Sequence, residues 1–219
     1  MIRLAVFDCD GTLVDSQATI CAALDAGFAA CGVEAPSPER GRSIIGLSLV
    51  EAMRELHPAG NAEQHDALST AYKSAFFDLR AAGLANEPLY EGIAEAITDL
   101  EARGWLLGVA TGKSDRGLKH ILEHHGLHPR FVTLQTADRH PSKPHPSMLH
   151  QAMRDAGATP EATVMIGDTS FDMDMAKAAG AWAIGVTWGY HSEDELRGAG
   201  ADRIARHASE LVTMLEELA

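Results

Sequence analysis

The chain has 219 residues, of which 46% are hydrophobic and 22% are charged, with 20 glycines and 9 prolines. This length predicts one large domain, alone or with a smaller partner, and the composition excludes collagen-like, coiled-coil and disordered chains. The net charge of −13 disfavours sequence-independent binding to nucleic acid, and it suits a divalent cation where carboxylates converge.

The cysteines and the apolar segments indicate the compartment. Cys9, Cys21 and Cys31 show no C-x-x-C spacing and cannot all pair with one another, which is typical of a reducing compartment. Asp8 interrupts the first apolar run before a signal peptide could form, and no apolar stretch approaches the ~20 residues of a membrane span. We therefore expect a cytoplasmic protein.

The first predicted element is a buried strand at residues 2–7, which ends at an acidic turn containing glycine. From residue 16 to about residue 85 we find only helical patterns, at residues 16–31, 47–56 and 62–80. A crossover between parallel strands needs only about a dozen residues. We therefore expect a helical cap domain at residues 16–86, inserted into an α/β core domain of residues 1–15 and 87–219.

Strand and helix patterns alternate in the rest of the chain. Strands are predicted at residues 105–110, 131–135, 163–166, 182–187 and 202–205. Amphipathic helices are predicted at residues 89–103, 114–125, 146–156 and 170–179, with a last helix near residues 209–218 that Ser209 could cap. This alternation predicts an α/β fold, a Rossmann-like parallel sheet covered by helices on both faces.

Two acids follow the first strand, in the sequence Asp8-Cys9-Asp10-Gly11-Thr12. Because strand side chains alternate, Asp8 and Asp10 should lean the same way and Cys9 should point into the core. Ligands of such sheets bind beyond the carboxyl ends of the strands. Two close carboxylates repel, so either one is protonated or a cation neutralises them. For this pair alone, a solvated Asp-Gly turn remains an equal alternative.

A second acidic pair follows the strand at residues 163–166. Asp168 stands at the strand end, and Asp172 lies in the first turn of the next helix. The helix dipole would explain Asp172 without any site, but it explains Asp168 less well. Asp8, Asp10 and Asp168 together would form the oxygen-rich site that Mg²⁺ prefers.

Two further segments could bind an anion. Thr111 and Gly112 close another strand and open a helix, where a hydroxyl and free N–H groups form an anion pocket, although Thr111 could also be a plain helix cap. The following Lys113 does not belong to a nucleotide phosphate loop, because Leu107 stands where that motif needs glycine. Lys143 lies beside two prolines that stiffen the backbone, which suggests a positioned cation.

Together these motifs resemble the haloacid dehalogenase-like superfamily of phosphohydrolases, specifically the phosphoglycolate-phosphatase-like subfamily with a helical cap after the first strand. The resemblance covers essentially the whole chain. The motifs occur in the family order: Asp8-x-Asp10-Gly11-Thr12, Thr111, Lys143 and Gly167-Asp168-x-x-x-Asp172.

The resemblance implies the roles of the two acids that follow the first strand. Asp8 would be the nucleophile that forms an aspartyl-phosphate. Asp10 would protonate the leaving oxygen and then activate water. Mg²⁺ would be held by Asp8, Asp168 and the backbone carbonyl of Asp10.

The same resemblance implies how the phosphoryl group is held. Thr111, Gly112 and Lys143 would bind the transferred group, and Asp172 would orient Lys143 or a metal-bound water. In the cap, Arg42, Gly46 and Ser48 are candidates for substrate specificity. Arginine suits a second anionic group such as a carboxylate, although an ordinary surface arginine remains the alternative.

The expected activity is Mg²⁺-dependent hydrolysis of a small phosphomonoester, with phosphoglycolate as the candidate that the subfamily suggests. The expected partner is a small phosphorylated metabolite, with neither nucleic acid nor membrane, and the protein is expected to be a monomer or a homodimer. A phosphoglucomutase-like transferase and a pyrophosphatase of the same fold remain open. A non-catalytic binding module is disfavoured, because clustered carboxylates destabilise a protein that has no use for a metal.

Overall fold

The first strand, β1 (Leu4–Phe7), lies in the middle of a parallel sheet in the computed structural model, which describes residues 2–219. The other strands are β2 (Leu106–Thr111), β3 (Thr133–Thr136), β4 (Thr163–Gly167), β5 (Trp182–Val186) and β6 (Arg203–Ala205). Their order is β3-β2-β1-β4-β5-β6, and every neighbouring pair is parallel. The predicted α/β fold is confirmed, and each strand lies within two residues of its predicted bounds.

Side-chain alternation in β1 divides the core of the sheet into two layers. Ala5, Phe7 and Cys9 belong to one apolar cluster, whereas Leu4 and Val6 belong to the other. A strand that is buried on both faces needs a continuous apolar run, as the sequence has here. The alternation continues to Cys9, which points into the core as predicted.

Helices cover both faces of the sheet. Residues of α5 (Ile93–Ala102), α6 (Asp115–His124) and α10 (Leu211–Leu218) pack in the layer of Phe7. Residues of α7 (Ser147–Ala156), α8 (Ser170–Ala179) and α9 (Glu193–Gly198) pack in the layer of Val6.

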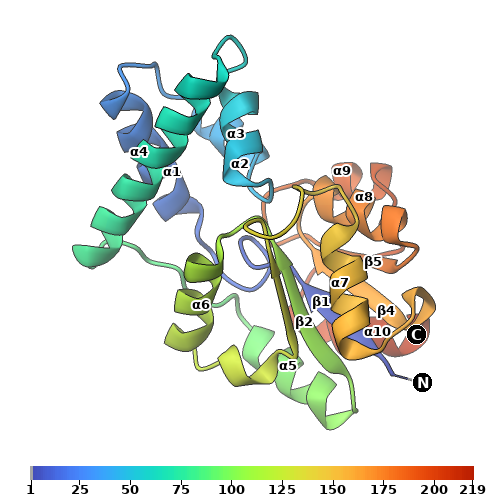
Figure 1. Cartoon of the computed structure of the whole chain (residues 1–219). Coiled ribbons are helices and arrows are strands. Elements are labelled where there is room, and N and C mark those ends of the chain that lie inside the picture. Colours follow the sequence, from blue (N-terminus) through green and yellow to red (C-terminus); the bar gives the residue numbers. More distant parts are fainter. Residues whose placement is uncertain (1) are drawn as a thin grey trace.

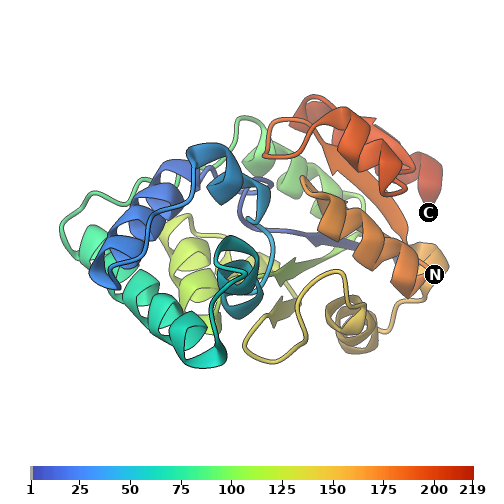
Figure 2. The same ribbon diagram turned by 90° about the horizontal axis from the view of Figure 1, so that it is seen from above.

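Four helices follow β1 and lie beyond its carboxyl end (Figure 1). They are α1 (Gln17–Ala30), α2 (Pro38–Ser43), α3 (Leu49–Leu56) and α4 (Ala62–Ala81). They have an apolar cluster of their own, which includes Phe28 and Met53. Figure 2 shows α1 and α4 side by side, so close at Gly27 that an added Cβ would lie 2.9 Å from Tyr72 N.

The two segments that connect these helices with the sheet run next to each other. Asp15 N donates to Pro88 O at 2.9 Å, and Tyr90 N donates to Leu13 O at 3.0 Å. The expected cap domain at residues 16–86 stays a prediction, and both of its proposed boundaries lie next to these paired segments.

Several details differ from the predictions. The helices α2 and α9 were not predicted, and α5 begins at Ile93 rather than at residue 89. The proposed cap at Ser209 is wrong, because α10 begins at Leu211 after a 3₁₀ turn over Ala208–Glu210. The Glu210 carboxylate accepts from the backbone N–H of Arg206 and His207, which fixes the start of that turn. Within residues 2–219, no helix is long and apolar enough to cross a membrane.

Candidate active site

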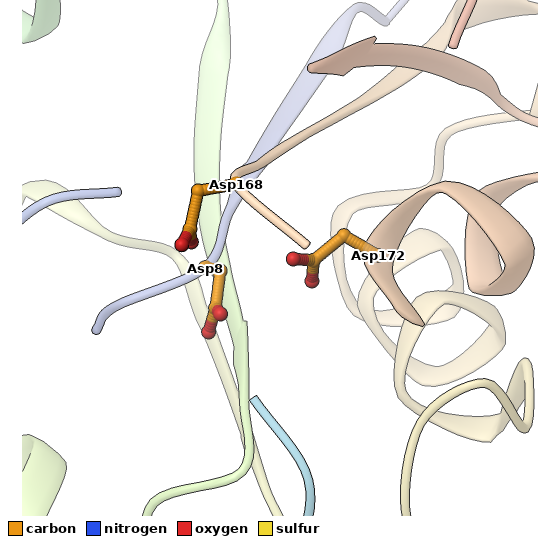
Figure 3. Close-up of side chains that lie close together, drawn as sticks. All are labelled: Asp8, Asp168 and Asp172. Atoms are coloured by element: carbon orange, nitrogen blue, oxygen red, sulfur yellow. The ribbon is translucent and has the colours of Figure 1, made fainter. Parts of the chain in front are cut away.

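Three buried carboxylates meet at the carboxyl edge of the sheet. Asp8 directly follows β1 and Asp168 directly follows β4, its neighbour in the sheet, while Asp172 comes from the first turn of α8. One oxygen of each lies within 4.8 Å of the others, and Figure 3 shows the three side chains lying close together. The predicted convergence of Asp8 and Asp168 is therefore present, and Asp172 joins them.

Lys143 is the cation of this cluster. Its Nζ lies 2.9 Å from Asp8 Oδ1 and 2.6 Å from Asp172 Oδ1, and its side chain is fully buried. Burial by itself would lower the pKa of this lysine, but the charges of Asp172 and Asp8 hold it above its usual value. Lys143 therefore stays charged, as expected of a residue that binds an anion.

One ammonium does not balance three carboxylates. Burial raises the pKa of Asp8 to about 7 although Lys143 acts in the opposite direction. Burial also raises the pKa of Asp168 well above its usual range, and the charges of Asp172 and Asp8 add to this effect. With every group ionised the cluster has a net charge of −2, which favours the binding of a cation.

The donor set fits a divalent cation. Among residues 2–219, Asp8 Oδ2 is a buried oxygen that has no hydrogen-bond partner. The Asp168 oxygens are oriented by Thr12 Oγ1 at 2.9 Å and by Tyr190 N at 3.0 Å. Carboxylate oxygens held in this way are the ligands that Mg²⁺ prefers. Gly11 lies against Asp168, and a Cβ added there would lie 2.1 Å from Asp168 Oδ2. Its φ of +82° also favours glycine.

Asp10 lies apart from this cluster, although it is also buried. Its Oδ1 accepts from Lys113 Nζ at 2.6 Å and from Ser16 Oγ. Its carboxylate is therefore engaged with other groups. The contribution predicted for Asp10 as a metal ligand, through its backbone carbonyl, stays a prediction.

Thr111 ends β2 and is buried beside Gly112. Its hydroxyl accepts from Lys113 N at 3.2 Å. The cap of α6 is Ser114, whose Oγ accepts from Gly117 N at 3.2 Å. The alternative that Thr111 is a plain helix cap is therefore wrong, because Ser114 takes that position.

Comparison with known proteins decides the family. A model of the haloacid dehalogenase-like hydrolases matches residues 5–186. The chain belongs to this family. It is therefore a hydrolase, as predicted, and the resemblance drawn from its motifs is confirmed.

Relatives and solved structures extend this similarity along the chain. The probable phosphatase IndB of Dickeya dadantii is 35% identical over 214 residues, which cover 97% of this chain and 93% of the relative. The phosphoglycolate phosphatase of Vibrio parahaemolyticus is 29% identical over 219 residues, which cover 98% of this chain and 96% of the relative. The crystal structure of a predicted phosphatase from Clostridium acetobutylicum superposes with a TM-score of 0.88 at 26% identity and covers both chains completely.

Gly46 and Ser48, two of the three residues predicted to determine specificity in this haloacid dehalogenase-like hydrolase, contact the segments that carry Gly112 and Lys143. An added Cβ at Gly112 would lie 2.7 Å from Gly46 O and 2.4 Å from Leu47 O, so the segment around Gly46 covers Gly112. Ser48 N donates to Ser142 Oγ at 2.8 Å, next to Lys143. Arg42, in contrast, lies on α2 with an exposed side chain.

Sequence reasoning missed the groups that surround Asp10. The sequence motifs give Lys113 no role once the nucleotide loop is excluded, and they do not mark Ser16 or Glu87 as site residues. One signal was available for Lys113. Lys113 follows Thr111 by two residues, just as Asp10 follows Asp8. The first pair stands at the end of β2 and the second at the end of β1, and these two strands are neighbours in the sheet.

Proposed function

We propose that this hydrolase is a Mg²⁺-dependent phosphatase that hydrolyses a small phosphomonoester through an aspartyl-phosphate on Asp8. The observation that carries the proposal is the buried cluster of Asp8, Asp168, Asp172 and Lys143, in which Asp8 Oδ2 has no partner among residues 2–219. Phosphoryl transfer depends mainly on neutralised charge and in-line positioning. This cluster contains both the charges and a carboxylate that is free to react.

In the first step, a carboxylate oxygen of Asp8 forms a bond to phosphorus while the ester P–O bond breaks. A proton from the Asp10 carboxyl goes to the leaving oxygen, an acid contribution that is typically worth ~10²–10⁴-fold in rate. The Lys143 ammonium offsets negative charge on the phosphoryl oxygens, and Asp172 holds this ammonium at 2.6 Å. The Thr111 hydroxyl and the Gly112 N–H would bind the same oxygens.

In the second step, Asp10 takes a proton from water as the water oxygen bonds to phosphorus. The bond between phosphorus and Asp8 breaks, which releases phosphate and restores both carboxyl groups. Because hydrolysis is divided into two easier steps, a weak nucleophile such as a carboxylate is sufficient for the first one. Bound Mg²⁺, held by Asp8 and Asp168, with the Asp10 carbonyl as the predicted further ligand, would supply positive charge to the phosphoryl group.

We propose that residues 16–86 form a cap that selects the leaving group. Support comes from the contacts of Gly46 and Ser48 with the segments that carry Gly112 and Lys143. The Vibrio parahaemolyticus relative is named a phosphoglycolate phosphatase, so phosphoglycolate is the first ester to test. The predicted cytoplasmic location and the prediction of a monomer or homodimer belong to this proposal, and three free cysteines agree with the location.

The test measures phosphate release from phosphoglycolate, sugar phosphates, nucleotides, pyrophosphate and p-nitrophenyl phosphate, with Mg²⁺ or with a chelator. We expect turnover with Mg²⁺ only, and none in Asp8→Asn. The matched control is Asp174→Asn, which alters an exposed acid of α8. Activity that persists in the chelator or in Asp8→Asn would contradict the proposal. An isomerised sugar phosphate as product would favour the mutase alternative, and sole turnover of pyrophosphate would favour the pyrophosphatase.

A further inference from the structure

Asp10 is held from outside the carboxylate cluster by a single ammonium group. Lys113 lies between β2 and α6, and its Nζ is 2.6 Å from Asp10 Oδ1. The same Nζ lies 3.4 Å from Glu87 Oε1 and 5.6 Å from the ring centre of Phe76 on α4. The Lys113 side chain is only 10% exposed. Such short, shielded, charge-assisted hydrogen bonds fix geometry better than surface ion pairs do.

Both segments that connect the cap helices with the sheet meet at this point. Ser16 belongs to the first connection, and its hydroxyl donates to the same Asp10 Oδ1. Glu87 belongs to the second connection, and its Oε2 accepts from Arg80 of α4 at 2.8 and 3.2 Å. Lys113 therefore links Asp10 to Glu87, and Glu87 links this pair to α4.

The two oxygens of Asp10 differ as a result. Oδ1 has two donors, Lys113 Nζ and Ser16 Oγ. Across residues 2–219, Oδ2 takes part in no hydrogen bond, and it is not among the fully buried atoms that lack a partner. Oδ2 is thus the oxygen that remains for an incoming molecule.

We propose that Lys113 is a positioning residue for the acid–base group. It fixes the Asp10 carboxyl group through Oδ1 so that Oδ2, which carries the proton in the first step, is presented to the leaving oxygen of the ester. The ion pair with Glu87 holds Lys113 in place and ties this orientation to the second connection of the cap. The inference rests on the proposed phosphatase function, because it concerns the leaving group of that reaction.

This role predicts an effect that depends on the leaving group. A p-nitrophenolate leaves with little help from a proton, whereas a phenolate or an alkoxide needs one. A misplacement of about 1 Å can cost about 10²-fold in rate. For Lys113→Met we therefore expect kcat/KM to fall about 10²-fold for phenyl phosphate and less than about tenfold for p-nitrophenyl phosphate.

The experiment measures kcat/KM with Mg²⁺ for a series of substituted phenyl phosphates, because this parameter reports the first phosphoryl transfer. Lys113→Met should make kcat/KM depend more steeply on the acidity of the leaving phenol than it does in the wild type. Lys113→Arg should bring this dependence part of the way back to that of the wild type. Glu87→Gln should shift the dependence in the same direction by a smaller amount. The control is Lys119→Met, an exposed lysine of α6 whose loss should leave the series unchanged.

Equal losses for all the esters in Lys113→Met would overturn the positioning role, because a merely structural defect lowers every rate alike. If Lys113→Met does not fold, an unchanged dependence in Glu87→Gln together with Lys113→Arg would overturn it instead. A wild-type protein that hydrolyses none of these esters with Mg²⁺ would overturn the proposed function itself. The two failures are therefore distinguishable.

Discussion

Replacement of Asp8 by asparagine should stabilise the metal-free protein at neutral and alkaline pH. Burial raises the pKa of Asp8 from its usual 3.8 to about 7. Between about pH 4 and pH 7 the folded protein keeps a proton that the unfolded chain has released, so the free energy of unfolding falls as the pH rises. Three pKa units at about 1.36 kcal/mol each give a loss of about 4 kcal/mol above pH 7.

Asparagine cannot ionise, so Asp8→Asn should escape most of this loss. Its side-chain oxygen can still accept from Cys9 N and from Lys143, as Asp8 Oδ1 does. We expect the variant to be more stable than the wild type at pH 8 by up to about 4 kcal/mol, and the difference to vanish near pH 4.

The assay is urea unfolding in a chelator, followed by tryptophan fluorescence at a series of pH values. Asp174→Asn is the control, because that exposed acid should leave the pH dependence unchanged. An Asp8→Asn protein that is less stable than the wild type at pH 8 would refute the reasoning. It would mean that the ion pair with Lys143 outweighs the cost of burying the carboxylate.

Three further outcomes are expected. Mg²⁺ at about one hundred times its dissociation constant should stabilise the wild type by about 2.7 kcal/mol in thermal or urea unfolding. Asp168→Asn should lose this stabilisation. An equal stabilisation of the variant would show that Asp168 is not a metal ligand. Asp10→Asn should slow an alkyl phosphate far more than p-nitrophenyl phosphate in steady-state assays, and equal losses would count against Asp10 as the acid. Gly112→Ala should lower the free energy of unfolding by about 1–3 kcal/mol, because its Cβ would lie 2.4 Å from Leu47 O. The control is Gly198→Ala, which places a Cβ in open space and should show no such steric loss. Equal changes in the two variants would contradict the close contact at Gly112.

The sheet and the edge that holds the acidic cluster could be predicted because both depend on local sequence. A strand buried on both faces must be a continuous apolar run, so the first acid after the run marks its carboxyl end. Asp8 and Asp168 both follow such runs, and the parallel order of β1 and β4 brings them together.

The two missed helices lack the apolar periodicity that marks longer ones. Each has six residues, and each buries a single residue, Gly41 in α2 and Leu196 in α9. Ser209 matched the preference for a helix cap, but the Glu210 side chain satisfies the backbone N–H groups before it. Local propensity therefore did not decide where α10 begins.

The environment of Asp10 could not be derived from local patterns. Lys113 is 103 residues away from Asp10 along the chain. Its contact depends on the register of β1 and β2, in which Phe7 pairs with Val109. Glu87 reaches the same place only because the two segments that connect α1–α4 with the sheet run side by side, which no periodicity in the sequence indicates.

The nucleophile is tested most directly by trapping the enzyme during turnover. The protein is mixed with Mg²⁺ and a phosphomonoester, quenched in acid within one turnover, digested and examined by mass spectrometry. The account predicts one added phosphoryl group on the peptide that contains Asp8, and none in Asp8→Asn. A phosphoryl group on another residue, or rapid product formation with Asp8 unmodified at every time point, would contradict it.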